Sequence, residues 1–134
     1  MTGLVLKLAP KERVLINGAV IENGDRRTRF AVVSQDAHIL RLRDAIHPEQ
    51  ANTPVRRICY SVQLVLSGDM SSKDAQARIM KGIEQLSQVF TDHDSRLQLS
   101  RATEAMAQGA HYRALKALRN LLPREERLMA AGSA

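Results

Sequence analysis

The segment from Val14 to Phe30, VLINGAVIENGDRRTRF, constrains the fold of this chain more than any other. It contains two Asn-Gly pairs, Asn17-Gly18 and Asn23-Gly24, each beside an apolar run. Asn-Gly is the strongest short-range signal for a β-hairpin, because both central residues of a type I′ turn have positive φ. Two such turns in close succession predict a tight antiparallel meander.

Alternating apolar residues predict the strands around these turns. Leu4, Leu6 and Leu8 would lie on one face of a strand that ends before Pro10. Ser34-Gln35-Asp36 predicts a further turn, and the segments on either side of it would pair as one hairpin. The predicted strands are Leu4 to Leu8, Arg13 to Ile16, Ala19 to Glu22, Arg27 to Val33 and Ala37 to Arg43.

Helix signals dominate after residue 52. Thr53 can cap a helix that has Pro54 at its first position, and Gly68 suits its C-terminal end. A capping box, Ser71-x-x-Asp74, predicts a second helix. The sequence further predicts a connection over 44–52 and an end of the second helix near Thr91. It also predicts a third helix that Asp94 caps and that ends at Gly109, a fourth helix from Ala110 to Leu122 and a flexible tail over 123–134.

Strands followed by helices predict an α+β protein, with an N-terminal antiparallel meander of about five short strands and about four C-terminal helices. The chain length of 134 residues suits a single domain. Within it, residues 1–43 would form the β-rich part and 53–122 the helical part. The helices would cover one face of the sheet or form a bundle beside it.

The composition favours an anionic partner and offers no catalytic site. Twenty Lys and Arg against 14 Asp and Glu give a net charge of +6, which suits nucleic acid. A merely soluble basic protein is the alternative. No two histidines have the spacing of metal ligands, and the adjacent residues His93-Asp94-Ser95 cannot easily converge as a triad. We therefore expect no enzymatic activity, metal or cofactor.

Cys59 is the only cysteine, so an intrachain disulfide is impossible, and we expect it to be a buried structural thiol. No stretch approaches the ~20 apolar residues of a membrane span. These features predict a cytoplasmic protein without a membrane partner.

Arginines carry the strongest indication of binding. In the hairpin predicted around residue 35, Arg29 lies opposite Arg41 and Arg27 opposite Arg43, all on one face. Like charges opposite each other destabilise a sheet, and guanidinium groups bind phosphate bidentately. The candidate RNA contacts here are Arg26, Arg27, Arg29, Arg41 and Arg43. The alternative is a solvated face neutralised by Glu12, Glu22 and Asp25.

Two further clusters lie in the predicted helices. Arg56 and Arg57 occupy the first turn of the first helix, where cations oppose the helix dipole, so we add them to the candidate RNA contacts. Pairing of one of them with Glu49 or Asp44 is the alternative. The second cluster lies on one side of the predicted fourth helix and consists of Arg113, Lys116 and Arg119. It is a weaker candidate for partner binding, and a solvated helix face is the favoured interpretation.

Several segments resemble the FlbT family of flagellar regulators: LVLKLAPKERV, INGAVIENGDRR, ANTPVRRICYSVQ and HYRALKALRNLLP. The resemblance implies a post-transcriptional regulator, usually a repressor, that associates with the 5′ untranslated region of flagellin mRNA and promotes its decay. It also implies a second small flagellar protein, FlaF, as a companion. Residues 67–74 and the tail after Arg127 depart from the family pattern.

Two functions remain open from the sequence. The first is an RNA-binding regulator whose arginines contact phosphates, with strong salt dependence because few aromatic side chains are available for base stacking. The second is a protein-interaction adaptor whose apolar helices bind flagellin or a FlaF-like protein. A homo-oligomer is also open, since an edge strand such as Leu4 to Leu8 could pair across a dimer.

Overall fold

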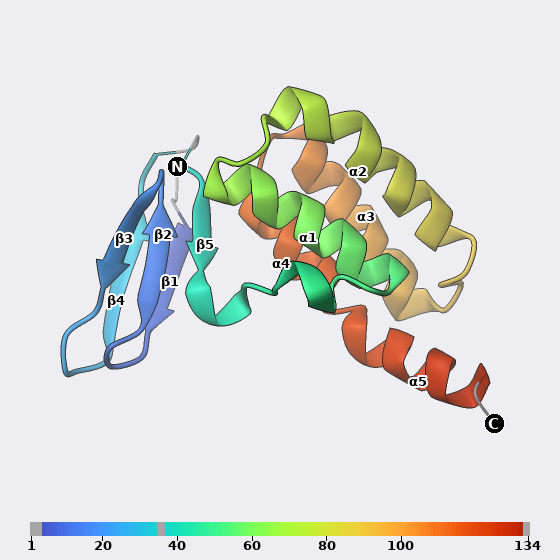
Figure 1. Cartoon of the computed structure of the whole chain (residues 1–134), viewed down its shortest axis with the longest axis horizontal. Coiled ribbons are helices and arrows are strands. Elements are labelled where there is room, and N and C mark those ends of the chain that lie inside the picture. Colours follow the sequence, from blue (N-terminus) through green and yellow to red (C-terminus); the bar gives the residue numbers. More distant parts are fainter. Residues whose placement is uncertain (1–3, 35–36, 133–134) are drawn as a thin grey trace.

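The structure, a computed structural model, describes residues 4–34 and 37–132. The strands lie at one end of the molecule and the helices at the other, as Figure 1 shows. Strands precede helices along the chain, which confirms the predicted α+β class. In the described ranges the strands are β1 (Leu4–Leu8), β2 (Arg13–Ile16), β3 (Ala19–Glu22), β4 (Thr28–Val32) and β5 (Ile39–Arg41).

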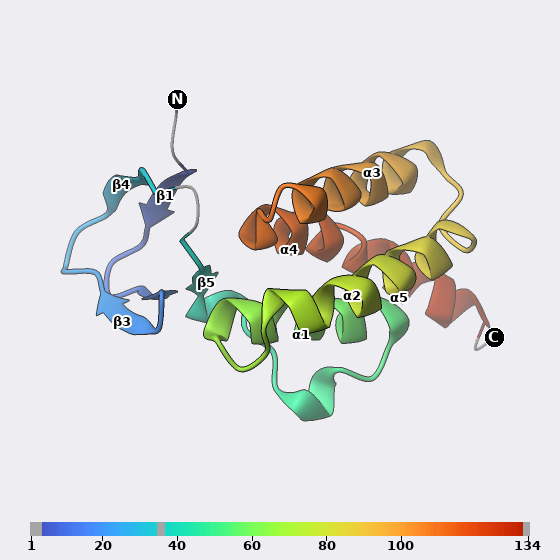
Figure 2. The ribbon, with the colours of Figure 1, turned by 90° about the horizontal axis from the view of Figure 1, so that it is seen from above.

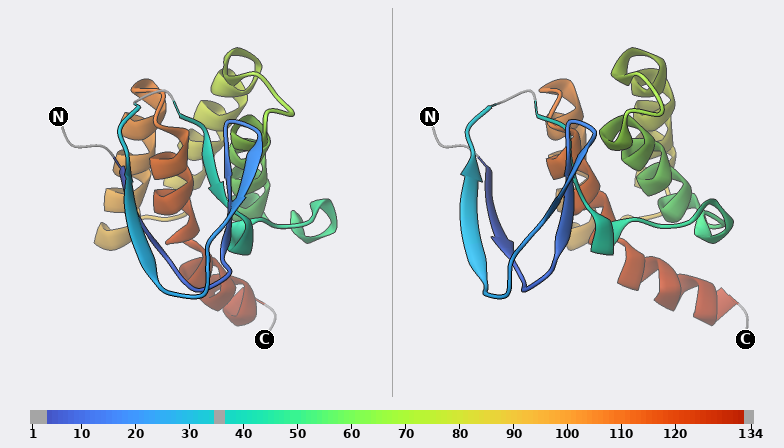
Figure 3. Two further views of the ribbon diagram at one scale, coloured as in Figure 1. Left: turned by 90° about the vertical axis from the view of Figure 1, so that its left-hand side faces the viewer. Right: turned by 60° about the vertical axis from the view of Figure 1, so that its left-hand side comes forward.

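The first Asn-Gly pair forms the predicted hairpin. Asn17 and Gly18 have φ values of 49° and 86°, and the turn joins β2 to β3 in antiparallel register. The second pair does not join neighbouring strands, because β3 and β4 belong to different sheets. There the Asn23 side-chain amide donates to Ala9 O, at 2.8 Å, and to Arg26 O, at 2.9 Å. It ties together the β1–β2 and β3–β4 connections, which lie side by side (Figure 3).

The strands form two antiparallel sheets, one ordered β1-β4 and one ordered β3-β2-β5. The hairpin predicted between Arg27–Val33 and Ala37–Arg43 is therefore wrong. β4 pairs with β1, and β5 is shorter than predicted because a 3₁₀ turn, η1 (Leu42–Asp44), follows it. Of the predicted turn between them, Gln35 and Asp36 lie outside the described residues.

Burial explains why β1 and β4 pair. On the inner face, Leu6 lies opposite Phe30, and Leu6 is almost fully buried. On the outer face, Lys7 lies opposite Arg29 and both are exposed. The register thus buries the apolar half of each alternating strand and leaves the charged half in solvent.

The helices form two layers beside the sheets, with α1 and α2 in one and α3 and α4 in the other (Figure 2). The helices thus form a bundle of their own, which the sequence left as the alternative to helices that cover one face of the sheet. The helices in the described residues are α1 (Pro54–Ser67), α2 (Ser72–Ser87), α3 (His93–Ala107), α4 (His111–Arg119) and α5 (Leu122–Gly132). A second 3₁₀ turn, η2 (Pro48–Gln50), precedes α1.

Local capping signals set most helix boundaries. The Thr53 and Ser71 hydroxyls accept from the backbone N–H groups of Arg56 and Asp74, as their positions predict. Gly68 ends α1 with φ of 86°. The third helix begins two residues earlier than predicted, because Asp92 rather than Asp94 is its N-cap.

The segment expected to be a flexible tail is helical as far as Gly132. Pro123 lies in the first turn of α5, a position where the missing N–H of proline costs nothing, so it does not simply end the helical region. The Glu125 side chain is buried and its carboxylate accepts from Thr53 Oγ1, at 2.5 Å, and from Val55 N, at 2.9 Å. α5 is therefore anchored to the N-terminus of α1.

The core combines one face of α1 with apolar side chains of the sheets and the other helices. Cys59 lies in it as expected, and burial raises the pKa of its thiol to about 12. No helix in the described ranges is long and apolar enough to cross a bilayer. The same residues contain no cluster of three potential metal ligands.

Candidate nucleic-acid interface

Four cations form what we call the strand-side cluster: Lys7, Arg26, Arg27 and Arg29. Lys7 and Arg29 face each other on the outer surface of the β1–β4 sheet, and Arg26 and Arg27 belong to the loop that leads into β4. All four are exposed, and none forms an ion pair with any residue in the described part of the chain. Lys7 is not among the contacts that the sequence predicts, because its place beside Arg29 depends on a strand pairing that local signals do not determine.

The carboxylates that could have neutralised this cluster have other partners. Asp25 pairs with Lys11 at 3.0 Å, and Glu22 pairs with Arg13 at 3.0 Å. Glu12 is bound to Arg41. The cluster therefore keeps its charge, and the like charges of Lys7 and Arg29 repel each other across the sheet.

Arg41 is a structural residue. Its Nε and Nη2 donate to the two carboxylate oxygens of Glu12, both at 2.7 Å, and Nη2 also donates to Lys7 O at 2.6 Å. Both side chains of the pair are largely buried. The Arg41 guanidinium holds the pKa of Glu12 down at about 2, well below its usual range. We therefore leave Arg41 out of the proposed RNA interface.

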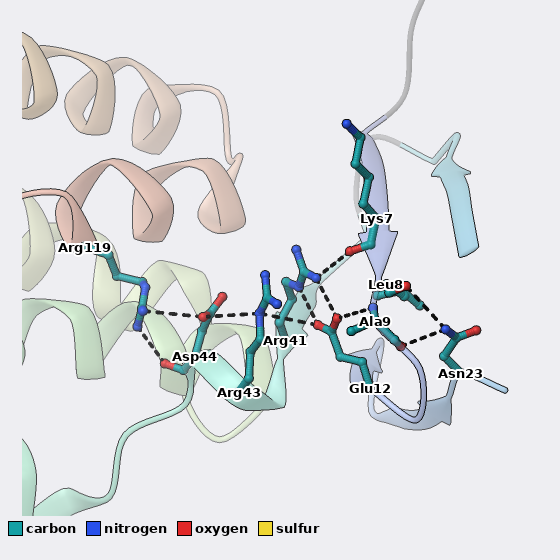
Figure 4. A network of polar contacts seen from close by, with 9 residues as sticks. All are labelled: Lys7, Leu8, Ala9, Glu12, Asn23, Arg41, Arg43, Asp44 and Arg119. Carbon is teal, nitrogen blue, oxygen red and sulfur yellow. Dashed lines mark hydrogen bonds and ion pairs between the residues drawn. The ribbon is translucent and has the colours of Figure 1, made fainter. Parts of the chain in front are cut away.

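A row of polar contacts continues from this pair to the helices (Figure 4). Arg43 Nε lies 3.6 Å from Glu12 Oε2 and 4.0 Å from Asp44 Oδ1. On the other side of Asp44, Arg119 of α4 donates to the Asp44 carbonyl at 3.0 Å and approaches its carboxylate at 3.4 Å. The row joins β1, the β1–β2 loop, β5, η1 and α4.

Where this row meets α4, the surface is hollowed by about 170 Å³, and we call this feature the junction hollow. The hollow brings together cations that the sequence placed in two separate clusters, Arg43 with Lys116 and Arg119. Lys116 is exposed and has no ion pair among the described residues. The lining residues are Arg41, Arg43, Asp44, Tyr112, Leu115, Lys116, Arg119 and Asn120.

The helix cations Arg56 and Arg57 lie elsewhere. α1 begins at the end of the bundle away from the strands, beside α5 (Figure 1). Arg56 lies 3.9 Å from Glu126 of α5 and close to Asn52, so neither acidic partner that the sequence suggested for it is used. Arg57 is exposed. These two arginines are not part of the same surface as the strand-side cluster.

Arg113 and Lys116 line a second hollow, of about 420 Å³, between α3 and α4. Arg101 of α3 contributes a further cation, while Glu104 contributes a carboxylate. Lys116 therefore borders both hollows. Of the three basic residues on α4, Arg113 lines only the second hollow, and Arg119 is held by Asp44.

Comparison with known proteins agrees with the resemblance in the sequence. The family model described as "Flagellar protein FlbT" matches residues 4–129. The chain belongs to the FlbT family. A probable flagellum biosynthesis repressor protein FlbT of Rhodopseudomonas palustris strain TIE-1 is 36% identical over 94% of this chain and 97% of that relative. A relative with the same printed name from Chelativorans sp. strain BNC1 is 30% identical over 95% of this chain and 86% of that relative. No solved structure matches.

In this member of the FlbT family, several residues that carry the resemblance have backbone roles. Asn17 and Gly18 form the type I′ turn, Asn23 joins two loops, and Thr53 caps α1. None of these roles needs a ligand. The strand-side arginines are different, because no contact within the described chain explains why charge is concentrated there.

Proposed function

We propose that this chain is a post-transcriptional repressor of flagellin synthesis that binds the 5′ untranslated region of flagellin mRNA. Its relatives are named as probable flagellum biosynthesis repressors, which supports a regulatory role. Binding would block translation or expose the message to nucleases. The protein itself would break no bond, so its affinity for RNA sets its effect.

The observation that carries this proposal is the strand-side cluster without carboxylate partners. Guanidinium groups fit phosphate bidentately, and an un-neutralised cluster gains most from an anionic ligand. Base stacking on aromatic rings has few sites here, because Phe90 and Tyr112 are buried and Phe30 faces the core side of its sheet. Tyr60 of α1 is half-buried and lies outside the strand-side cluster. Recognition would depend on arginine and phosphate, so affinity should fall steeply with salt.

The test is binding of purified protein to a flagellin 5′ leader RNA and to a scrambled RNA across a salt series. We expect preference for the leader and a steep loss of affinity with salt. The charge-reversed variant Arg27→Glu/Arg29→Glu should lose RNA binding while its unfolding transition stays intact. Equal affinity of this variant and the wild type would remove the strand-side cluster from the site.

A matched control separates local from global charge effects. Lys73→Glu/Arg78→Glu changes the net charge equally on exposed positions of α2, and neither residue forms an ion pair in the described ranges. If both double variants weaken binding alike, the effect comes from net charge rather than from a site.

A second candidate function, a protein adaptor, is supported by one observation. A groove of about 550 Å³ separates α2 from α3, and its floor includes Met80, Ile83 and Leu99. Flagellin or a FlaF-like protein would bind there, and effects on RNA would follow indirectly. Ala77→Glu introduces a charge at the groove wall. Loss of a co-purifying protein in this variant, with RNA binding absent from the wild type, would favour the adaptor.

A further inference from the structure

We propose that the junction hollow binds one phosphate group, held between the Arg43 guanidinium and the Lys116 ammonium. This inference rests on the proposed RNA-binding function and extends its contact surface from the strands to α4. The phosphate would belong to the RNA, either as an internal phosphodiester or as the 5′-terminal phosphate. The chemistry at the hollow is the same in both cases.

Charge balance at the hollow leaves two cations in excess. Four basic side chains line it, and two carboxylates are in contact with them. Glu12 is bound most closely by Arg41, at 2.7 Å, and the Asp44 carboxylate lies 3.4 Å from Arg119. Arg43 approaches both carboxylates only at 3.6 and 4.0 Å, and Lys116 approaches none of the described ones. Arg43 and Lys116 therefore remain available for an external anion.

Part of the wall of the hollow is held in place by contacts within the protein, whereas Arg43 and Lys116, which also line it, are exposed. Its wall includes the buried Tyr112 and the half-buried Arg41, which is held by Glu12 and the Lys7 carbonyl, and Arg119 makes two contacts to Asp44. Its volume of about 170 Å³ admits a small group such as a phosphate. An anion placed between two cations beside a fixed wall is bound more strongly than by either side chain alone in open solvent.

The position of the junction hollow relative to Lys7 also supports an RNA phosphate as its ligand. Arg41 lines the hollow and donates to the backbone carbonyl of Lys7, whose side chain belongs to the strand-side cluster. Figure 4 shows Lys7, Arg41, Arg43 and Arg119 along one row. An RNA strand that contacts both the junction hollow and the strand-side cluster would pass Lys7.

The experiment measures RNA affinity across a salt series for the full-length wild type and for Arg43→Gln/Lys116→Gln. The probe is the flagellin 5′ leader, prepared with a 5′-phosphate or a 5′-hydroxyl. The control is Lys73→Gln/Arg78→Gln, which removes the same charge from α2. We expect the first variant to reduce the slope of log affinity against log salt by about 0.7 for the lost single-strand contact, and the control to keep the wild-type slope.

The outcomes separate the two proposals. Identical slopes for the hollow variant and the control would overturn the inference, while loss of binding in Arg27→Glu/Arg29→Glu would leave the proposed function standing. Absence of wild-type RNA binding would refute the proposed function, and the inference with it. A 5′-phosphate preference that disappears in the hollow variant identifies the terminal phosphate; equal binding of both RNAs with a reduced slope identifies an internal phosphodiester.

The single variant Lys116→Gln guards against a folding defect, because Arg43 also approaches Glu12 and Asp44 whereas Lys116 has no charged partner in the described chain. Its urea unfolding transition should match that of the wild type. A reduced salt slope in this folded variant supports the phosphate contact, and an unchanged slope counts against it.

Discussion

Glu12 of the β1–β2 loop and Arg41 of β5 form a bidentate ion pair, with both donor–acceptor distances at 2.7 Å. The two residues are 29 positions apart in sequence, so the pair is a tertiary contact between distant segments of the β-rich part. Because Arg41 also donates to Lys7 O and Glu12 accepts from Ala9 N, the pair fixes the end of β1 as well. Through Arg43, the Glu12 carboxylate is also linked to Asp44 of η1, which Arg119 of α4 contacts.

We predict that Glu12→Gln destabilises the protein by about 3 kcal/mol, because it leaves the largely buried Arg41 without its counter-ion. Urea unfolding at neutral pH measures the change. Glu22→Gln is the matched control, since its partner Arg13 is exposed and such a pair contributes at most about 1 kcal/mol. Equal losses in the two variants would contradict the central role of the Glu12–Arg41 pair.

The same pair predicts a pH dependence. The pKa of Glu12 is about 2 in the folded protein against an ordinary value of 4.5. A depressed folded-state pKa contributes stability above the ordinary pKa, and this contribution is lost as the pH falls from about 4.5 through about 2. The full loss is about 3 kcal/mol. Unfolding free energies measured from pH 6 to pH 2 should fall less steeply in Glu12→Gln than in the wild type.

Sequence analysis predicted the features that local signals determine. Thr53, Ser71 and Gly68 mark helix ends through contacts within one turn of the chain, and the structure places them there. Asn17-Gly18 likewise forms its turn from its own backbone preferences. The α+β class follows from the order of such elements.

Strand pairing could not be predicted in the same way. β4 pairs with β1 because together they bury an apolar face, and this gain depends on residues more than 20 positions away. The composition of the candidate site depends on the same strand pairing and therefore could not be predicted in full either. Arg27 and Arg29 were selected through a hairpin that does not form, and their place beside Lys7 comes from the β1–β4 pairing. The meeting of Arg43 with Lys116 likewise depends on tertiary contacts.

A third prediction concerns Glu125, which joins α5 to the start of α1. Glu125→Ala should destabilise the protein by about 2 kcal/mol, because Thr53 Oγ1 and Val55 N–H lose a buried acceptor. Hydrogen exchange of the α5 amides should accelerate as the helix loses its anchor. Glu126→Ala provides the control, since Glu126 is exposed and lies 3.9 Å from Arg56; a change beyond about 0.5 kcal/mol there would argue against the anchor.

The last prediction compares the glycines of the two Asn-Gly pairs, because only Gly18 adopts a positive φ. Gly18 has φ of 86° with no atom within 4 Å of an added Cβ, so Gly18→Ala should cost about 1–2 kcal/mol from backbone strain alone. Gly24 has no positive φ and equal space, so Gly24→Ala should be neutral or slightly stabilising, since it restricts the unfolded chain. Thermal unfolding of both variants makes the comparison. Equal destabilisation would mean that Gly24 also adopts positive φ, and that the second pair forms the hairpin turn which its sequence predicts.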